Sequence, residues 1–232
     1  MAIAVAKQRS VSKAAEKARR RFLRFFPKGF RDETYISWER GYKLRAHERW
    51  HELLPRDVFR RLLRDEDFAE IGTRSMKALS GTNLIFSFES MALRDALKTD
   101  RGARIFSEGL YEFLYGRSAL PQRFDDWCGV VASLPKKQSR VLTWPVVTVF
   151  GFLAQPETHI FFKPTATRSA AERYGFDLPY QSRPSWDTYV NVLEFASVVT
   201  SDLRDLKPKD MIDIQSFIWV TGSSEYDAMA GR

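Results

Sequence analysis

The sequence of 232 residues predicts an all-α fold, and three observations support this. Apolar residues recur at intervals of three and four through most of the chain, which is the spacing of one helix face. Prolines fall in or beside the proposed connections, where a residue without an N–H costs least. No segment requires the alternating pattern of a half-buried strand. Because 44% of the residues are hydrophobic, we expect a multi-helical globular domain that folds on its own.

Residues 1–31 predict a basic N-terminal arm. They hold ten Lys and Arg and one acid, Glu16, so they carry +9, and the net charge of +8 leaves −1 for the body, residues 32–232. The arm is predicted to be an amphipathic helix with apolar residues on one face and cations on the other. The apolar residues are Val11, Ala15, Ala18, Phe22 and Phe25, and the cations are Lys13, Lys17, Arg20, Arg21 and Arg24. A basic arm on a neutral body favours a polyanionic partner; a solubility tail or a transit peptide is the alternative.

The body is predicted to be a series of helices separated by Pro, Gly and acidic breaks. The predicted segments are 32–54, two short helices within 56–79, 82–98, 102–115, 123–134, 143–153, 165–174, 186–203 and 209–220. They form one unit or two helical lobes, 32–134 and 135–232.

The first helix of the body carries an apolar face that we expect to be buried, and Pro55 ends it. The face consists of Tyr35, Trp38, Tyr42, Ala46, Trp50 and Leu53. Acidic residues 65–67 divide the next two helices, and Gly81 separates them from the apolar helix over 82–98.

The most apolar segment, residues 143–154, permits two interpretations. Its β-branched residues cluster at 146–152, and so short an apolar run fits a buried strand as well as a helix; we predict a helix. This run and the run at 212–220 are shorter than the ~20 residues that cross a bilayer. We therefore expect no membrane partner.

The remaining composition predicts a cytoplasmic monomer without a cofactor. Cys128 is the only cysteine, so no internal disulfide can form. The apolar residues 1–6 are too short for a signal-peptide core. The glycine-rich motifs of nucleotide-binding proteins are absent, as are the nucleophile motif of α/β-hydrolases and the C-x-x-C motif.

Residues 47–51 match the H-E-x-x-H pattern, in which two imidazoles one helical turn apart bind Zn²⁺ beside a general-base Glu. The match consists of His47, Glu48 and His51, with Arg49 and Trp50 between them. A charged residue inside the motif and the lack of a clear third ligand, for which only His159 and Glu89 are candidates, count against zinc. A zinc-dependent hydrolase therefore remains an alternative, and we predict no bound metal.

Residues 134–220 show an order of features that resembles the helix-hairpin-helix DNA glycosylase superfamily. Leu134-Pro135 and four polar residues precede a buried helix, and an apolar approach at 160–162 leads to Lys163-Pro164 and a helix that ends near Gly175. The resemblance implies cleavage of an N-glycosidic bond in double-stranded DNA after the nucleotide is flipped from the stack. It also implies that the hairpin positions contact phosphate, and these are Lys136, Lys137, Gln138 and Ser139 in place of the family's glycines.

The position that matches the family's catalytic Asp is occupied by Lys163. An amine beside apolar neighbours can have a lowered pKa, and its neutral form can attack the sugar C1′ carbon. An acid is still needed for the developing positive charge, and the candidates are Asp213, Asp210 and Glu89. Polar and aromatic residues suited to a flipped-base pocket are Tyr180, Trp186, Gln215 and Trp219. A surface Lys before a proline, a first-turn Asp and core aromatics are the corresponding structural explanations.

The sequence thus predicts a DNA-binding protein of the glycosylase type that excises a damaged or modified base, in repair or in antiviral defence. The first rival is a non-enzymatic nucleic-acid-binding module, in which the arm holds phosphate. The second is the zinc hydrolase.

Overall fold

The computed structural model describes residues 12–137 and 140–230, and in these residues it is helical without any strand. The prediction of an all-α protein is therefore confirmed. The α-helices are α1 (Lys13–Phe25), α2 (Glu33–Tyr35), α3 (Gly41–Leu53), α4 (Arg56–Arg64), α5 (Phe68–Ala78), α6 (Ser87–Leu97), α7 (Asp100–Tyr115), α8 (Leu120–Ser133), α9 (Trp144–Ala154), α10 (Pro164–Tyr174), α11 (Trp186–Asp202), α12 (Met211–Gly222) and α13 (Ser224–Ala230). A π-helical segment, Ile36–Arg40, joins α2 to α3.

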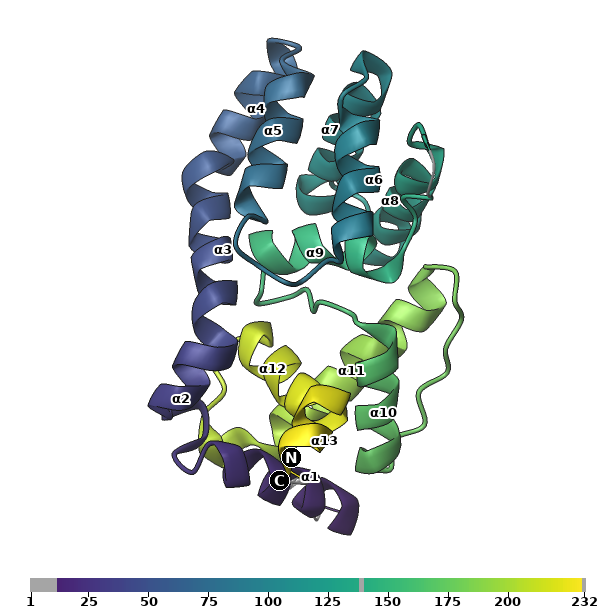
Figure 1. The fold of residues 1–232 in the computed structure, drawn as a ribbon. Coiled ribbons are helices and arrows are strands. Elements are labelled where there is room, and N and C mark those ends of the chain that lie inside the picture. Colours follow the sequence, from purple (N-terminus) through teal and green to yellow (C-terminus); the bar gives the residue numbers. More distant parts are fainter. Residues whose placement is uncertain (1–11, 138–139, 231–232) are drawn as a thin grey trace, which may run out of the picture.

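The helices lie in two groups, with α4–α9 at one end of the molecule and α1, α2 and α10–α13 at the other (Figure 1). Helix α3 runs along one side and packs against α5 and α9, and the π segment that precedes it packs against α12. The connection from α9 to α10 passes between the two groups (Figure 1). This connection ends at Lys163, so the residue that sequence analysis singled out lies near the junction.

Local sequence explains where most helices begin. Proline opens or nearly opens α8, α9 and α10, where its missing N–H removes no helical hydrogen bond. Side-chain oxygens of Ser12, Thr99 and Asp210 accept hydrogen bonds from the first-turn N–H groups of α1, α7 and α12. Helix α10 ends at Gly175, whose φ of 70° lies in the left-handed region that favours glycine.

The predicted helix over 82–98 is wrong in its first turn, because α6 begins only at Ser87. Turn-forming residues follow Gly81, and residues 82–86 instead form an irregular segment beside the Lys163 side chain. The strand alternative for 146–152 is excluded, because α9 is helical throughout and every one of its residues is buried. A helix after residue 220 was not predicted, and α13 occupies that place.

The expectation that Trp38 is a core residue is wrong: 52% of it is exposed. The π segment explains the difference, since the Gly41 N–H donates to the Ile36 carbonyl five residues earlier and the wider turn shifts the side-chain register. The inward positions on this stretch are held by Glu39, Arg40 and Lys43, all of which are buried. Tyr35, Ala46 and Trp50 are buried as predicted.

Helix α1 packs against α10 and α12. Ala15, Ala18 and Phe22 are buried, and the Phe22 ring lies 5.3 Å from that of Phe217 on α12. Helices α10 and α12 approach closely where α12 ends, because a Cβ at Gly222 would lie 1.9 Å from the Ala166 carbonyl oxygen.

Through residues 12–137 and 140–230, no helix has both the length and the apolar character that a bilayer span needs.

Candidate active site around Lys163

The backbone at Lys163 is fixed by buried hydrogen bonds on the segment that precedes it. The Ile160 N–H donates to the Tyr189 hydroxyl at 3.0 Å, and the Phe162 N–H donates to the Thr148 hydroxyl at 3.0 Å. Lys163 itself is extended, with φ −103° and ψ 99°, as expected for a residue before proline. The Lys163 side chain therefore projects from a backbone segment that is apolar and held by buried hydrogen bonds.

The amine of Lys163 lies between two aromatic rings that come from different parts of the chain. Its Nζ is 5.0 Å from the ring centroid of Phe86 and 4.9 Å from that of Trp219 on α12. It also donates a hydrogen bond of 3.1 Å to the carbonyl oxygen of Asn83. The irregular segment before α6 thus meets α10 and α12 at this amine.

Burial lowers the pKa of Lys163 below the ordinary lysine value, while the negative charges of Glu225 and Glu89 act in the opposite direction. The positive charge of Lys43 lowers the pKa of Lys163 further. Both ring contacts favour the protonated amine and oppose the effect of burial. The net lowering gives Lys163 a larger neutral fraction than an exposed lysine has at the same pH.

A cavity of about 480 Å³ opens beside this amine. Such a volume is in the range of small-molecule sites in proteins. Side chains of several elements line it, and among them are Phe86, Pro145, Lys163, Ser169, Trp219 and Glu225. The cavity combines aromatic faces, one amine and acidic groups, which suits a ligand that is partly flat and partly charged.

Glu89 is buried on the first turn of α6 and accepts a 2.8 Å hydrogen bond from the Phe86 N–H. It thereby holds the backbone of the residue whose ring covers Lys163. Its charge also acts on the Lys163 amine, although the carboxylate is not part of the cavity lining. Glu89 is a positioning residue in this arrangement.

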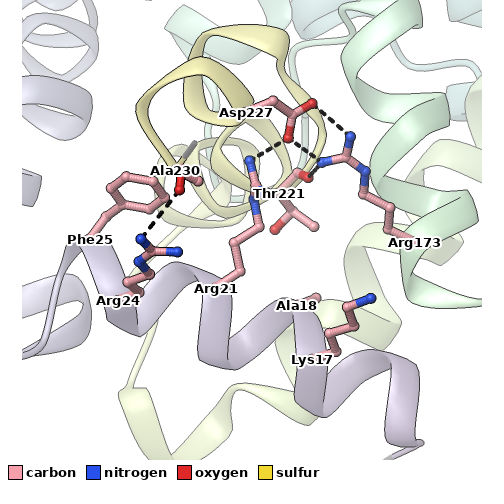
Figure 2. A pocket seen from close by; sticks show the side chains of 9 residues that line it. All are labelled: Lys17, Ala18, Arg21, Arg24, Phe25, Arg173, Thr221, Asp227 and Ala230. Atoms are coloured by element: carbon pink, nitrogen blue, oxygen red, sulfur yellow. Dashed lines mark hydrogen bonds and ion pairs between the residues drawn. The ribbon is translucent and has the colours of Figure 1, made fainter. Parts of the chain in front are cut away.

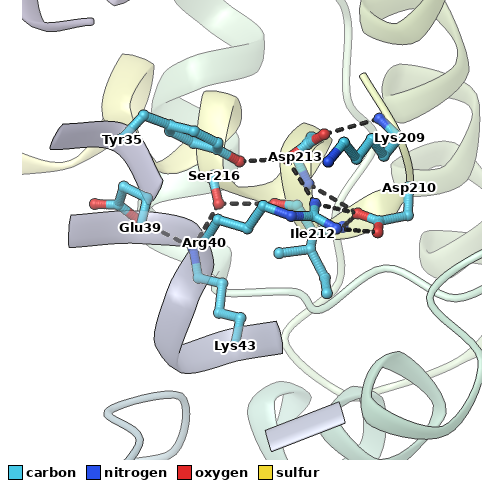
Figure 3. A network of polar contacts seen from close by, with 9 residues as sticks. All are labelled: Tyr35, Glu39, Arg40, Lys43, Lys209, Asp210, Ile212, Asp213 and Ser216. Carbon is cyan, nitrogen blue, oxygen red and sulfur yellow. Dashed lines mark hydrogen bonds and ion pairs between the residues drawn. The ribbon is translucent and has the colours of Figure 1, made fainter. Parts of the chain in front are cut away.

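Asp213 lies in a buried polar network at the start of α12 (Figure 3). Its carboxylate accepts hydrogen bonds from the Tyr35 hydroxyl at 2.5 Å, from the Arg40 guanidinium at 2.7 Å and from the Lys209 N–H at 2.8 Å. Arg40 also forms two hydrogen bonds of 2.9 and 2.7 Å with Asp210. Neither Asp213 nor Asp210 lines the cavity at Lys163. Their contacts indicate a structural role.

A second buried charge pair joins the π segment to the C-terminal helices. The Lys43 amine, 1% exposed, contacts Glu39 at 3.0 Å and Ser216 at 2.8 Å (Figure 3). Glu39 in turn accepts a 2.8 Å hydrogen bond from the Tyr226 hydroxyl on α13. Burial alone would lower the pKa of Lys43, but the Glu39 carboxylate raises it above the usual lysine value. Lys43 therefore keeps its charge although it is buried.

Of the four residues predicted to form a base pocket, Trp219 lines the cavity with Lys163 and the other three do not. Tyr180 contacts Phe162 and lies under the Arg168 guanidinium, 4.7 Å from its ring centroid. Trp186 packs on Phe124 and Tyr189. Gln215 is buried in α12, and no described group pairs with its side-chain oxygen.

The predicted phosphate-contacting residues fall into three groups. Arg20 is exposed on α1, while Arg21 and Arg24 on the same helix contact Asp227 and the Ala230 carbonyl (Figure 2). Lys136 and Lys137 are exposed between α8 and α9. Gln138 and Ser139 lie outside the described residues.

His47 and His51 lie on α3 facing the last turn of α9. Nδ1 of His47 is 2.6 Å from the Leu153 carbonyl, and Nε2 of His51 is 3.1 Å from the Ala154 carbonyl. Both rings therefore bind carbonyl groups that α9 leaves unpaired at its C-terminus. Among residues 12–137 and 140–230, no group of three or more His, Cys, Asp or Glu side chains could hold a metal ion.

Asn83, Phe86 and Glu225 at the Lys163 site were not expected from the sequence: Asn83 accepts the hydrogen bond of the amine, and Phe86 and Glu225 line the cavity. The first two fall in the segment taken as a continuous helix, and Glu225 follows the last predicted element. Turn-forming residues after Gly81 and the Ser at 87 were a usable signal for a later helix start.

No protein-family model matches the chain, and comparisons with curated proteins and with solved structures found no match.

Proposed function

We propose that the protein binds DNA and releases a damaged or modified base, with Lys163 as the nucleophile. The observation that carries the proposal is the Lys163 amine, whose pKa burial lowers, at the wall of a cavity of about 480 Å³ between two aromatic rings. Aromatic faces stack on a nucleobase, and a neutral amine can attack the sugar. The resemblance of residues 134–220 to helix-hairpin-helix glycosylases points to the same chemistry.

The proposed reaction uses the Lys163 amine as the nucleophile and a carboxylate at the cavity to stabilise developing charge. The neutral amine attacks C1′ of a flipped nucleotide, the N-glycosidic bond breaks, and the base leaves with the bonding electron pair and takes up a proton. The attached nitrogen gives one proton to the departing base and the other to O4′ as the C1′–O4′ bond breaks, which leaves an imine that water hydrolyses to the free amine and the opened sugar. The carboxylate of Glu225, which lines the cavity and whose charge acts on this amine, stabilises the positive charge that develops on the sugar, while Glu89 holds the Phe86 backbone.

The surface beside the cavity supports a partner with stacked bases. Phe86, Phe88 and Met91 at the start of α6 are 52%, 56% and 60% exposed. The rings of Phe86 and Phe88 stack on each other with centroids 5.5 Å apart and planes 9° from parallel. Exposed apolar residues gathered in this way indicate an interaction surface. Bases removed from a duplex stack well on such rings.

Borohydride trapping tests the chemistry directly. The protein is incubated with duplexes that each carry one damaged or modified base, and released base and covalent protein–DNA adduct are measured. We expect Lys163→Ala and Lys163→Arg to lose both products, because neither side chain supplies a neutral amine. Lys98→Ala is the matched control, since that amine is exposed and pairs with Asp95 on α6. Normal base release by either Lys163 variant would exclude Lys163 as the nucleophile.

A nucleic-acid-binding module without chemistry is the second candidate, and one observation favours it. The Lys163 amine already donates to the Asn83 carbonyl and lies over two rings that favour its ammonium form. DNA binding by the wild-type protein, with no adduct and no released base, would support this candidate.

A further inference from the structure

A second cavity, of about 450 Å³, lies between α1, α10 and α13 and is strongly basic (Figure 2). Four of the side chains that line it are cations, and one is an acid, which gives these five groups a net charge of +3. The cations are Lys17, Arg21, Arg24 and Arg173, and the acid is Asp227.

Asp227 is bound in this cavity as an anionic ligand would be. Its carboxylate accepts two hydrogen bonds from Arg173, at 2.8 and 2.7 Å, and one from Arg21 at 2.6 Å. The Arg173 hydrogen bond, more than any other contact, lowers the pKa of Asp227 below its usual range. Two guanidinium groups that converge on one pair of oxygens match the geometry of phosphate recognition.

The two arginines are held in place without Asp227. Nε of Arg21 donates to the Val220 carbonyl at 3.1 Å, and the Arg173 guanidinium donates to the Thr221 carbonyl at 2.7 Å. Both carbonyls belong to the last turn of α12, whose dipole favours cations. A ligand that displaces Asp227 would thus find both guanidinium groups already in position.

The cavity is open to a large ligand. Lys17 and Arg24 are exposed, and the side chains of Arg173 and Asp227 are 38% and 40% exposed. One carboxylate leaves most of the positive charge unneutralised. This excess is greater than an internal ion pair requires.

We propose that this cavity binds a backbone phosphate of a nucleic acid, and that Asp227 occupies the phosphate position in the free protein. Asp227 also lines the cavity at Lys163, so a phosphate bound here lies next to that site. The inference rests on the proposed nucleic-acid partner but not on base release. When the phosphate binds, Arg21 and Arg173 release the Asp227 carboxylate and contact the phosphate in its place.

The test uses an undamaged duplex, the full chain and a Lys163→Ala background, so no chemistry contributes. Asp227→Asn removes the competing anion and keeps the side-chain shape. Asp205→Asn is the matched control, because it also removes one acid from an ion pair with an α1 arginine, Arg19, outside the cavity. Affinity is measured by fluorescence anisotropy over a series of salt concentrations, with inorganic phosphate as a second probe.

We expect Asp227→Asn to bind the duplex several-fold more tightly than Asp205→Asn does. Arg173→Gln, the second variant in case Asp227→Asn unfolds, should weaken binding and make the log–log salt slope shallower by about 0.9, the value for one phosphate. Equal affinities of the two Asn variants, or an unchanged slope for Arg173→Gln, would overturn the proposal. Effects on inorganic phosphate alone would overturn the nucleic-acid occupant. If the wild-type protein formed no borohydride adduct, base release would be contradicted, but the conclusion about phosphate binding in this cavity would not change.

Discussion

The hydroxyl of Tyr35 donates a hydrogen bond of 2.5 Å to the carboxylate of Asp213, although 178 residues separate them in the chain. Asp213 is fully buried, and Arg40 joins it to Asp210 in the same network. Burial and the Asp213 charge raise the pKa of Tyr35 well above its usual value, so the hydroxyl remains a donor. The N-terminal residues and α12 are therefore linked by charged groups that are mostly buried, since the Arg40 and Asp210 side chains are 8% and 15% exposed.

Replacing Asp213 with Asn should destabilise the protein by about 3–5 kcal/mol, because it leaves the buried Arg40 guanidinium with one partner fewer. The measurement is urea unfolding followed by circular dichroism. Asp205→Asn is the comparison: its carboxylate is 60% exposed, and an exposed ion pair is worth about 0–1 kcal/mol. Unchanged stability together with lost base release would instead make Asp213 a catalytic group.

The helical series could be read from the sequence because it depends on local patterns. Apolar spacing and Pro or Gly breaks lie within a few residues of each other, and the predicted segments for α7, α9 and α11 differ from the structure by at most two residues at their ends. The π segment could not be read in this way. Its wider turn exposes Trp38 and buries Glu39 and Lys43, against the apolar pattern.

Most partners distant in the chain could not be inferred from local patterns. Arg21 and Asp227 are 206 residues apart, and nothing local to either residue indicates the other. Lys163 was predicted as a site residue from a resemblance in order and spacing. The cavity beside it depends on how α6, α10 and α12 pack together, which the sequence does not indicate. For the same reason Tyr180 and Trp186 were grouped with Trp219, although their contacts lie elsewhere.

Purified protein should contain no stoichiometric zinc. His47 and His51 each bind a carbonyl at the end of α9 through one ring nitrogen, and among the described residues no third His, Cys, Asp or Glu side chain joins them as a metal ligand. Elemental analysis of protein prepared without chelator checks this. His51→Ala should cost about 1 kcal/mol of stability through the lost hydrogen bond. One zinc ion per chain that disappears in His51→Ala would contradict this account.

Removing exposed cations from α1 should weaken DNA binding without unfolding the protein. Deleting residues 1–31 is not a clean test, because Phe22 and Ala18 are buried in the core. Lys13 and Arg20 are exposed, and a double change to Gln keeps the helix. If both contact phosphate, the log–log salt slope should fall by about 1.8, or 0.9 for each lost contact. An unchanged slope would exclude these two side chains from the interface, and circular dichroism checks the fold.

Stability should fall as the pH is lowered from 6.5 toward 4, and His159 is one cause. Burial, aided by the charge of Arg123, lowers the pKa of His159 from 6.5 to about 4. The unfolded chain binds the proton first, so stability declines by up to about 1.4 kcal/mol per pH unit in this window. Urea unfolding at several pH values should show a shallower decline for His159→Gln, which cannot titrate. Equal slopes for variant and wild type would remove His159 from the explanation.

Base release should increase with pH and level off below the pH at which an ordinary lysine loses its proton. The nucleophile is the neutral amine of Lys163, and burial lowers the pKa that sets its fraction. The charge of Glu225 acts in the opposite direction and holds that pKa up. Replacing Glu225 with Gln should therefore move the rise in single-turnover rate to lower pH.

Glu172→Gln is the control for this shift, because Glu172 is exposed on α10 and does not line the Lys163 cavity. Its pH profile should match that of the wild type. Lys163→Ala should yield no adduct at any pH, which separates the amine from background hydrolysis. A Glu225→Gln profile that shifts to higher pH would contradict a neutral amine as the attacking group, because loss of the nearby negative charge favours deprotonation. A profile that coincides with the wild type would show that Glu225 does not control this amine.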